Sequence, residues 1–122
     1  MKYKRIFPEL FVTNVDAAAR VFEDLGFVRG VTHVESDGLD FVIMECGPIE
    51  VNLHWMLRKP EQLQLEKTIR LYFEPENLVG LHRSLQSKGY DVSAIEDTGY
   101  GADVFHMTGP DGYEFWFQQF VL

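Results

Sequence analysis

The 122-residue sequence predicts an α+β fold in which one strand–helix–strand–strand–strand module occurs twice. Three observations support this prediction: an internal repeat of half the chain, a glycine that closes a helical pattern in each half, and a tight-turn dipeptide near the end. The composition, 46% hydrophobic and 25% charged, is typical of a globular protein. We therefore expect one domain over residues 1–122.

Two segments of the chain follow the same pattern. Leu10 opens the first and Leu71 opens the second, 61 residues later, and the glycines that close them, Gly26 and Gly89, are 63 residues apart. Both spacings are close to half of the chain, as expected of a duplicated module. We expect the first module at 1–57, a polar linker at 58–67 and the second module at 68–122.

Each module begins with a short apolar strand and continues into an amphipathic helix. Asn14 is a favourable N-cap for the first helix, and Pro75 suits the first turn of the second. Gly26 and Gly89 are well placed to end the two helices, because glycine readily adopts the left-handed conformation found there.

Three strand-like runs follow each helix. In the first module they lie at 28–35, 39–46 and 49–56, and in the second at 91–96, 103–108 and 113–121. The dipeptide Asp111-Gly112 predicts a tight hairpin turn between the last two strands. Each module therefore has the element order strand, helix and three strands.

The charge and cysteine content exclude several classes of function. A net charge of −8 gives no basic surface for DNA or RNA, so we expect no nucleic-acid partner. No apolar run approaches the roughly 20 residues of a membrane span, and we expect no membrane association. The single cysteine, Cys46, cannot form an intrachain disulfide, which favours a reducing compartment, and we expect a cytoplasmic protein.

Side chains alternate between the two faces of a strand, so each predicted strand divides into two sets. One set is uniformly apolar and is expected to form the core under the helices: Leu10, Val12, Val51, Leu53, Ile69, Leu71, Phe73, Phe115 and Phe117. The other set mixes aromatic, charged and polar groups: Phe7, Glu9, Phe11, Glu50, Asn52, His54, Thr68, Arg70, Tyr72, Glu114, Trp116 and Gln118. This mixture is typical of ligand grooves. We favour a groove over a dimer interface, in which aromatic residues and Arg are also enriched.

Three segments carry a resemblance to a known family: FPELFV at 7–12, LGF at 25–27 and GADVFHMTGPDGYEF at 101–115. Together with the element order, they resemble the vicinal oxygen chelate superfamily, which includes glyoxalase I, bleomycin-resistance proteins and extradiol dioxygenases. The resemblance implies curved mixed sheets around a groove, with the helices on the outer face. The strand that begins at Phe7 is most similar to that of the bleomycin-resistance branch, whose members are homodimers that sequester a drug unchanged.

The resemblance also bears on metal binding. Metal enzymes of this superfamily take His, Gln or Glu ligands from the first and last strand of each module. At the matching positions this chain has Phe7, Asn52, Thr68 and Trp116. Phenyl and indole rings cannot bind a divalent ion, and Asn or Thr alone binds one weakly. We therefore expect no metal and no other cofactor.

We take nine residues of the mixed set as the candidate ligand-binding site: Phe7, Glu9, Phe11, Asn52, His54, Arg70, Tyr72, Glu114 and Trp116. Glu9 and Glu114 would hold a cationic ligand while the rings contact its planar parts. Alternatively, one of these acids pairs with Arg70. The expected function is non-catalytic sequestration of a small cationic or aromatic molecule, as in antibiotic resistance of the bleomycin type.

A second function remains open, that of a metalloenzyme with relocated ligands. Glu9, His54 and Glu114 each lie two residues from a usual ligand position, and three such groups could hold a divalent ion for isomerase, transferase or oxygenase chemistry. Of the other histidines, we expect His33 and His82 on the surface. His106 either lines the groove or packs structurally.

Overall fold

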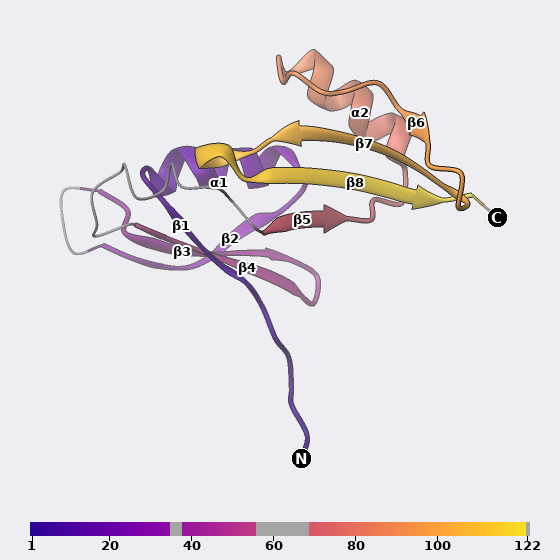
Figure 1. Cartoon of the computed structure of the whole chain (residues 1–122). Coiled ribbons are helices and arrows are strands. Elements are labelled where there is room, and N and C mark those ends of the chain that lie inside the picture. The colour runs from indigo at the N-terminus through magenta and orange to yellow at the C-terminus, as the bar shows by residue number, and fades with distance from the viewer. Residues whose placement is uncertain (35–37, 56–68, 122) are drawn as a thin grey trace. The chain divides into compact units, whose positions relative to one another are not determined.

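A computed structural model describes residues 1–34, 38–55 and 69–121, which leaves the predicted linker at 58–67 and Thr68, a member of the predicted mixed set, outside the described residues. The chain divides into two compact units, Met1–Leu65 (unit 1) and Glu66–Leu122 (unit 2). Each unit contains one helix and one four-stranded mixed sheet (Figure 1). The predicted α+β fold of two strand–helix–strand–strand–strand modules is confirmed.

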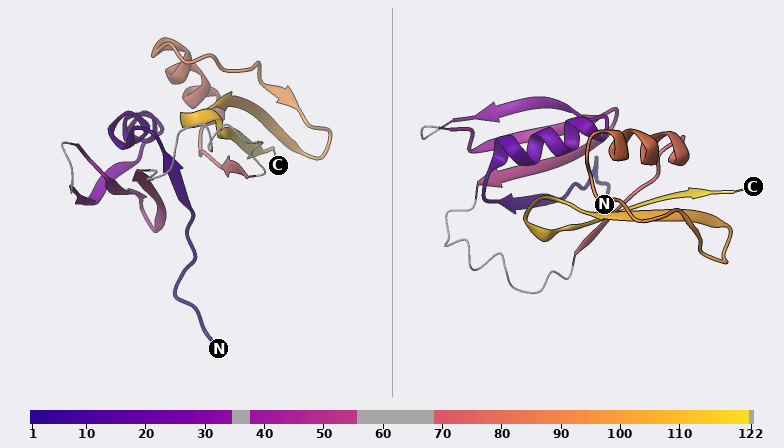
Figure 2. Two further views of the ribbon diagram at one scale, coloured as in Figure 1. Left: turned by 60° about the vertical axis from the view of Figure 1, so that its left-hand side comes forward. Right: turned by 90° about the horizontal axis from the view of Figure 1, so that it is seen from above.

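Unit 1 is built from β1 (Glu9–Val12), α1 (Val15–Asp24), β2 (Val28–His33), β3 (Phe41–Cys46) and β4 (Ile49–Trp55). The strand order is β1-β4-β3-β2, with β1 parallel to β4 and the other neighbours antiparallel. Helix α1 lies along one face of this sheet (Figure 2). Its buried side chains pack there with buried strand residues, and together they form the core of unit 1: Val15, Ala18, Ala19, Phe22, Leu10, Val12, Val42, Met44, Val51 and Leu53.

Unit 2 repeats this plan with β5 (Arg70–Phe73), α2 (Leu78–Ser87), β6 (Glu96–Asp97), β7 (Ala102–Thr108) and β8 (Glu114–Phe120). The strand order is β5-β8-β7-β6, and β5 is parallel to β8. Phe105 and Phe117 stack in its core with ring centroids 4.7 Å apart. Ile69, which we predicted in the core, is 57% exposed because it precedes β5 and lies outside the sheet. None of the helices in the described part of the chain is both long and apolar enough to span a membrane.

The helix ends follow the predicted signals in three of four cases. Asn14 caps α1, its Oδ1 accepting from the backbone N–H of Ala17 at 2.9 Å, and Gly26 and Gly89 follow the two helices with φ of +100° and +92°. The prediction of Pro75 in the first turn of α2 is wrong. Asn77 caps that helix instead by accepting from the N–H of Gly80 at 3.0 Å, so the helix begins after the proline.

The predicted hairpin turn is present between β7 and β8. Asp111 and Gly112 have φ of 53° and 82°, and the N–H of Tyr113 donates to the carbonyl of Pro110 at 3.1 Å. Positive φ at both central residues is the geometry that Asp-Gly favours in a tight hairpin turn. The turn fixes which residues of β7 and β8 face one another.

The predicted strand at 91–96 is wrong for most of its length. Only an isolated bridge from Val92 to Met107 and the short strand β6 are present. The Oγ of Ser93 accepts from the backbone N–H of His106 at 2.9 Å, and the Nε2 of His82 lies 2.8 Å from the carbonyl of Ser93. These side-chain contacts take the place of regular strand pairing over most of 91–96. They also place His82 partly inside unit 2, so our prediction of a surface position for His82 is wrong.

Candidate ligand-binding faces of the two sheets

The face of the unit 1 sheet opposite α1 carries the mixed set of side chains predicted from the sequence. On β4, Val51 and Leu53 are buried toward the helix, so the alternate residues point to the other side. We call this surface the helix-free face of unit 1. Its members come from the N-terminal segment, β1, β3 and β4: Phe7, Glu9, Phe11, Phe41, Ile43, Glu45, Glu50, Asn52 and His54.

Strand register decides which of these side chains are neighbours. His54 stands between Phe11 on β1 and Phe41 on β3, and its ring lies edge-on to both, at centroid distances of 5.7 and 6.0 Å. Glu45 on β3 stands directly opposite Glu50 on β4. The face therefore has an aromatic end around His54 and an acidic end around Glu50.

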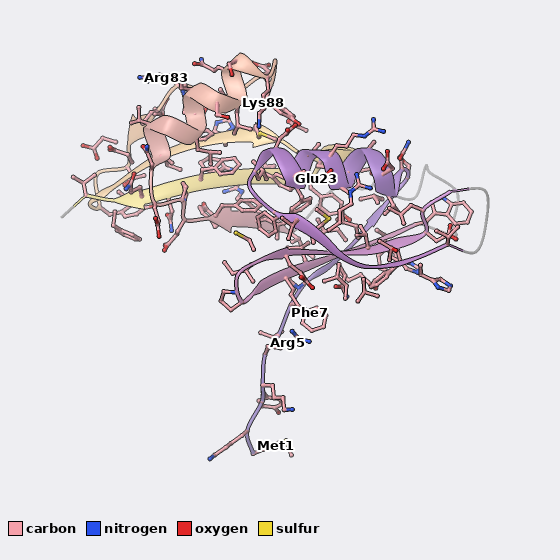
Figure 3. The ribbon with its side chains drawn as sticks, turned by 180° about the vertical axis from the view of Figure 1, so that it is seen from behind. Met1, Arg5, Phe7, Glu23, Arg83 and Lys88 are labelled. Atoms are coloured by element: carbon pink, nitrogen blue, oxygen red, sulfur yellow. The ribbon has the colours of Figure 1, made fainter. Side chains whose placement is uncertain are left out.

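The N-terminal segment adds a cation to the acidic end. Arg5 forms an ion pair with the Oε1 of Glu50, and its guanidinium lies 5.4 Å from the centroid of the Phe7 ring. Figure 3 shows Arg5 and Phe7 on the side of the unit 1 sheet that is opposite to α1, where Glu23 is labelled. The Glu50 side chain is only 14% exposed, so this pair is shielded from water on the carboxylate side.

The helix-free face of unit 2 is centred on the indole of Trp116. Its members come from β8 and from the strands on both sides of it, β5 and β7: Arg70, Tyr72, His106, Thr108, Glu114, Trp116 and Gln118. The His106 ring stacks on the indole at 4.5 Å, the Arg70 guanidinium lies 4.4 Å from the indole centroid, and the Tyr72 ring is 6.0 Å away. Trp116 is therefore held between neighbours from β5 and β7.

Polar side chains of this second face form hydrogen bonds with other residues of unit 2. The Nε of Arg70 donates to the Oε2 of Glu114 at 2.8 Å, and the Nε2 of Gln118 donates to the Oε1 of Glu74 at 3.0 Å. A hydrogen bond with the Tyr72 side chain, together with the bond to Glu114, raises the pKa of Arg70 above its ordinary value. The alternative that one acid pairs with Arg70 is thus the one observed for Glu114.

Four buried side-chain atoms find no hydrogen-bond partner within the described residues: Glu50 Oε2, Asn52 Oδ1, His54 Nδ1 and Trp116 Nε1. Most buried polar groups in proteins are hydrogen-bonded, and each exception calls for an explanation. All four of these atoms belong to the two helix-free faces, and none to the helix-covered cores. The two helix-free faces are thus where the unpartnered buried polar atoms of the described residues lie.

The predicted site residues therefore fall into two groups. Unit 1 brings together Phe7, Glu9, Phe11, Asn52 and His54, and unit 2 brings together Arg70, Tyr72, Glu114 and Trp116. The sequence analysis did not place Phe41 or Glu45 in the site and left the role of His106 open, although all three lie beside predicted members. The alternation of side chains along 39–46 and 103–108 indicated which residues share a face. The strand register, which shows that these residues lie beside the predicted site, was not known from the sequence.

The residues present do not fit the metal site of the family. The matching positions Phe7, Asn52 and Trp116 offer one weak ligand between them, and neither unit gathers three His, Cys, Asp or Glu side chains within its described residues. The relocated ligands of the alternative hypothesis are Glu9, His54 and Glu114. Glu9 and His54 lie on neighbouring strands, but Glu9 stands opposite Asn52 and not opposite His54. Glu114 lies in unit 2, where it binds Arg70.

A pocket of about 270 Å³ lies elsewhere, at the start of α1. Its lining includes Asn14, Asp16, Asp40 and Trp55. This volume is below the roughly 300–1,000 Å³ typical of sites for drug-sized ligands. The helix-free faces therefore remain the stronger candidates for binding a molecule of that size.

Comparison with known structures identifies the fold. The chain is similar to a bleomycin resistance determinant encoded on the transposon Tn5 (TM-score 0.71, 19% identity, 98% of this chain and 100% of that chain covered). It is also similar to TnmS3, an antibiotic binding protein from Streptomyces sp. CB03234 (0.75, 17%, 98% and 98%). A glyoxalase-related enzyme from Clostridium phytofermentans matches as well (0.76, 18%, 99% and 98%).

At the sequence level, no curated protein matches the chain. The profile of a family does match, over residues 5–117, which is nearly the whole length. The chain belongs to the Glyoxalase/Bleomycin resistance protein/Dioxygenase superfamily.

Proposed function

We propose that this protein binds and sequesters a small cationic or aromatic organic molecule without changing it chemically. One observation carries the proposal: the four buried polar atoms without partners coincide with the two faces on which aromatic and acidic side chains gather. A molecule bound on either face would supply the hydrogen bonds missing there. It would cover Phe11 on the face of unit 1, which is 44% exposed, or Tyr72 on the face of unit 2, which is 52% exposed.

The chemistry of the two faces suits such a molecule. The orientation of the Trp116 ring is fixed by His106 and Arg70, so a ligand that contacts it costs little side-chain entropy. The carboxylates of Glu9, Glu45 and Glu50 attract a cation, and the net charge of −8 favours its approach.

The similar structures include proteins named for binding or resistance and one named as an enzyme. Two of the similar structures are named for bleomycin resistance and for antibiotic binding, and a third is named as a glyoxalase-related enzyme. The fold thus serves binding proteins as well as enzymes. We favour binding because the positions that match the family's metal ligands carry Phe7 and Trp116. We further propose a role in antibiotic resistance, as a cytoplasmic homodimer.

Native mass spectrometry of protein purified without chelator tests the proposal, with bleomycin and a panel of aromatic cationic antibiotics added in turn. We expect a metal-free dimer near twice 14.1 kDa that gains the mass of an unmodified antibiotic. A stoichiometric metal that disappears in His54→Ala, or a bound compound of altered mass, would instead identify an enzyme. A protein that retains none of the compounds would refute sequestration.

A further inference from the structure

We propose that Glu50, Asn52 and His54 form an acceptor row that selects ligands carrying several N–H donors, such as primary or secondary ammonium and guanidinium groups. This inference rests on the proposed function and narrows it, since a general affinity for aromatic or cationic molecules does not require N–H groups. The row lies on β4 of unit 1, and each of its members has one buried atom that lacks a partner among the described residues.

The three side chains are regularly spaced. Successive members are two residues apart on one strand, so they share a face and lie roughly 6.5–7 Å from one another. Strand β4 is paired on both sides, with β1 and with β3, so its backbone groups are used in the sheet and cannot serve these side chains. The missing partners must therefore come from neighbouring side chains or from another molecule.

The neighbouring side chains supply almost no donors. The residues on the flanking strands that share this face are Glu9, Phe11, Phe41, Ile43 and Glu45. Ionised carboxylates only accept hydrogen bonds, and Phe and Ile have no polar side-chain atoms. Arg5 donates to Oε1 of Glu50, the oxygen that already has a partner, and leaves Oε2 without one.

In unit 2 the position that corresponds to Glu9 carries a hydrogen-bond donor. Because Leu10 and Leu71 open the two repeats, Glu9 on β1 corresponds to Arg70 on β5. Arg70 faces Glu114 across the sheet and donates to it at 2.8 Å, whereas Glu9 faces Asn52 and has nothing to donate. An acid in unit 1 thus replaces the donor found in unit 2, and this replacement leaves the row short of donors.

The unpaired atoms define the class of ligand. Glu50 Oε2 and Asn52 Oδ1 are acceptors, and His54 Nδ1 accepts in the tautomer that carries its proton on Nε2. Arg5 already demonstrates the geometry within the chain, since its guanidinium binds Glu50 beside the ring of Phe7. An amine or guanidinium chain that runs along β4, with an aromatic group near Phe11 or Phe41, would satisfy the whole row.

A matched pair of probes tests this selectivity: N-benzyl-1,3-diaminopropane and its fully quaternised N-methyl analogue, which has the same ring and charge but no N–H. We expect isothermal titration calorimetry to show at least about tenfold tighter binding of the diamine, because hydrogen bonds to charged or buried acceptors are strong. Glu50→Gln and Asn52→Leu should reduce this ratio. Glu96→Gln, the same charge change at an exposed position on β6, should preserve it.

The outcomes separate this inference from the proposed function. Equal affinity for the two probes would overturn the acceptor row and leave sequestration intact. Binding of an aromatic antibiotic by native mass spectrometry with no binding of the diamine would do the same. If neither the antibiotic panel nor either probe binds, both proposals fail.

A second measurement needs no ligand. Replacing a buried acceptor that has no donor with an apolar side chain of similar size removes an unfavourable burial. We therefore expect Asn52→Leu to unfold at the same temperature as the wild type or at a higher one, while it loses the preference for the diamine. A lower melting temperature would show that Asn52 has a structural partner, and it would overturn the acceptor row.

Discussion

The imidazole of His106 stacks on the indole of Trp116, with ring centroids 4.5 Å apart and ring planes inclined by 26°. The two residues face one another across β7 and β8, in the register set by the Asp111-Gly112 turn. Arg70 contacts the same indole from β5. The turn therefore sets the register of β7 and β8, and this register places His106 against the ring of Trp116.

Removal of the Trp116 ring should weaken ligand binding. We expect Trp116→Ala to lose at least ~1 kcal/mol of binding free energy, the amount associated with one stacked aromatic contact. Titration calorimetry with a compound that native mass spectrometry has identified measures this loss. Trp55→Ala is the matched control, because Trp55 lines the pocket at the start of α1 and not the helix-free face. Equal affinities of Trp116→Ala and wild type would remove Trp116 from the site.

The two asparagine caps should each stabilise their helix. We expect Asn14→Ala and Asn77→Ala to lower the free energy of unfolding by about 1 kcal/mol each, because a backbone N–H at each helix start loses its acceptor. Urea denaturation measures the change. Asn→Asp at the same positions keeps the acceptor and should retain most of the stability. If Asp and Ala variants were equally unstable, the caps would not be the cause.

The ion pairs that join α1 to β2 predict a dependence of stability on pH. A hydrogen bond from Arg29 is the main reason that the pKa of Asp16 lies below its ordinary value of 3.8, and Arg20 lowers it further. A carboxyl whose pKa falls on folding stabilises the fold above its unfolded pKa, and this contribution disappears as the pH drops through the folded value.

Thermal unfolding of Asp16→Asn at several pH values tests this dependence. Near pH ~7 the variant should melt slightly below the wild type, because exposed ion pairs contribute little. The two melting temperatures should converge as the pH falls below 3.8. A difference that stays constant down to pH ~2 would mean that the charge on Asp16 does not stabilise the fold.

His82 should contribute to the stability of unit 2. Its Nε2 lies 2.8 Å from the carbonyl of Ser93, and its ring packs edge-on against Phe105 at 4.9 Å. We expect His82→Ala to lower the free energy of unfolding by about 1–2 kcal/mol, the sum of one hydrogen bond and one aromatic contact. Arg83→Ala, at the next and exposed position of α2 (Figure 3), should change it by less than about 0.5 kcal/mol. Similar effects of both variants would contradict a specific role for His82.

Most of the fold was predictable because its signals are local. Asn14, Gly26 and the Asp111-Gly112 turn each act within a few residues, and alternation along β4 and β8 separated the core from the helix-free faces. Pro75 suited a helix start by its fixed φ, but the helix begins after Asn77, whose Oδ1 accepts from the N–H of Gly80, and the proline alone did not indicate this. The strand prediction for 91–96 was wrong. The Oγ of Ser93 accepts from the backbone N–H of His106, and the local sequence does not reveal this contact with a residue distant in sequence.

The sequence predicted which residues belong to the candidate site, but not which of their side chains pair with one another. Period-two patterns assigned Asn52, His54 and Trp116 to their faces, yet they could not show which side chains stand opposite them. The bond between Arg70 and Glu114 follows from the parallel register of β5 and β8, and the position of Glu45 opposite Glu50 follows from that of β3 and β4. These pairings decide which polar atoms remain available to a ligand.

The most direct test of binding at the helix-free faces is a nuclear magnetic resonance titration that follows the indole N–H signals of the two tryptophans. Trp116→Phe assigns the signals, and the ligand is a compound found to bind by native mass spectrometry. Because the Nε1 of Trp116 has no partner among the described residues, its signal should shift when the ligand binds, and that of Trp55 should not. A saturating ligand that shifts only the Trp55 signal, or neither, would contradict binding at this face.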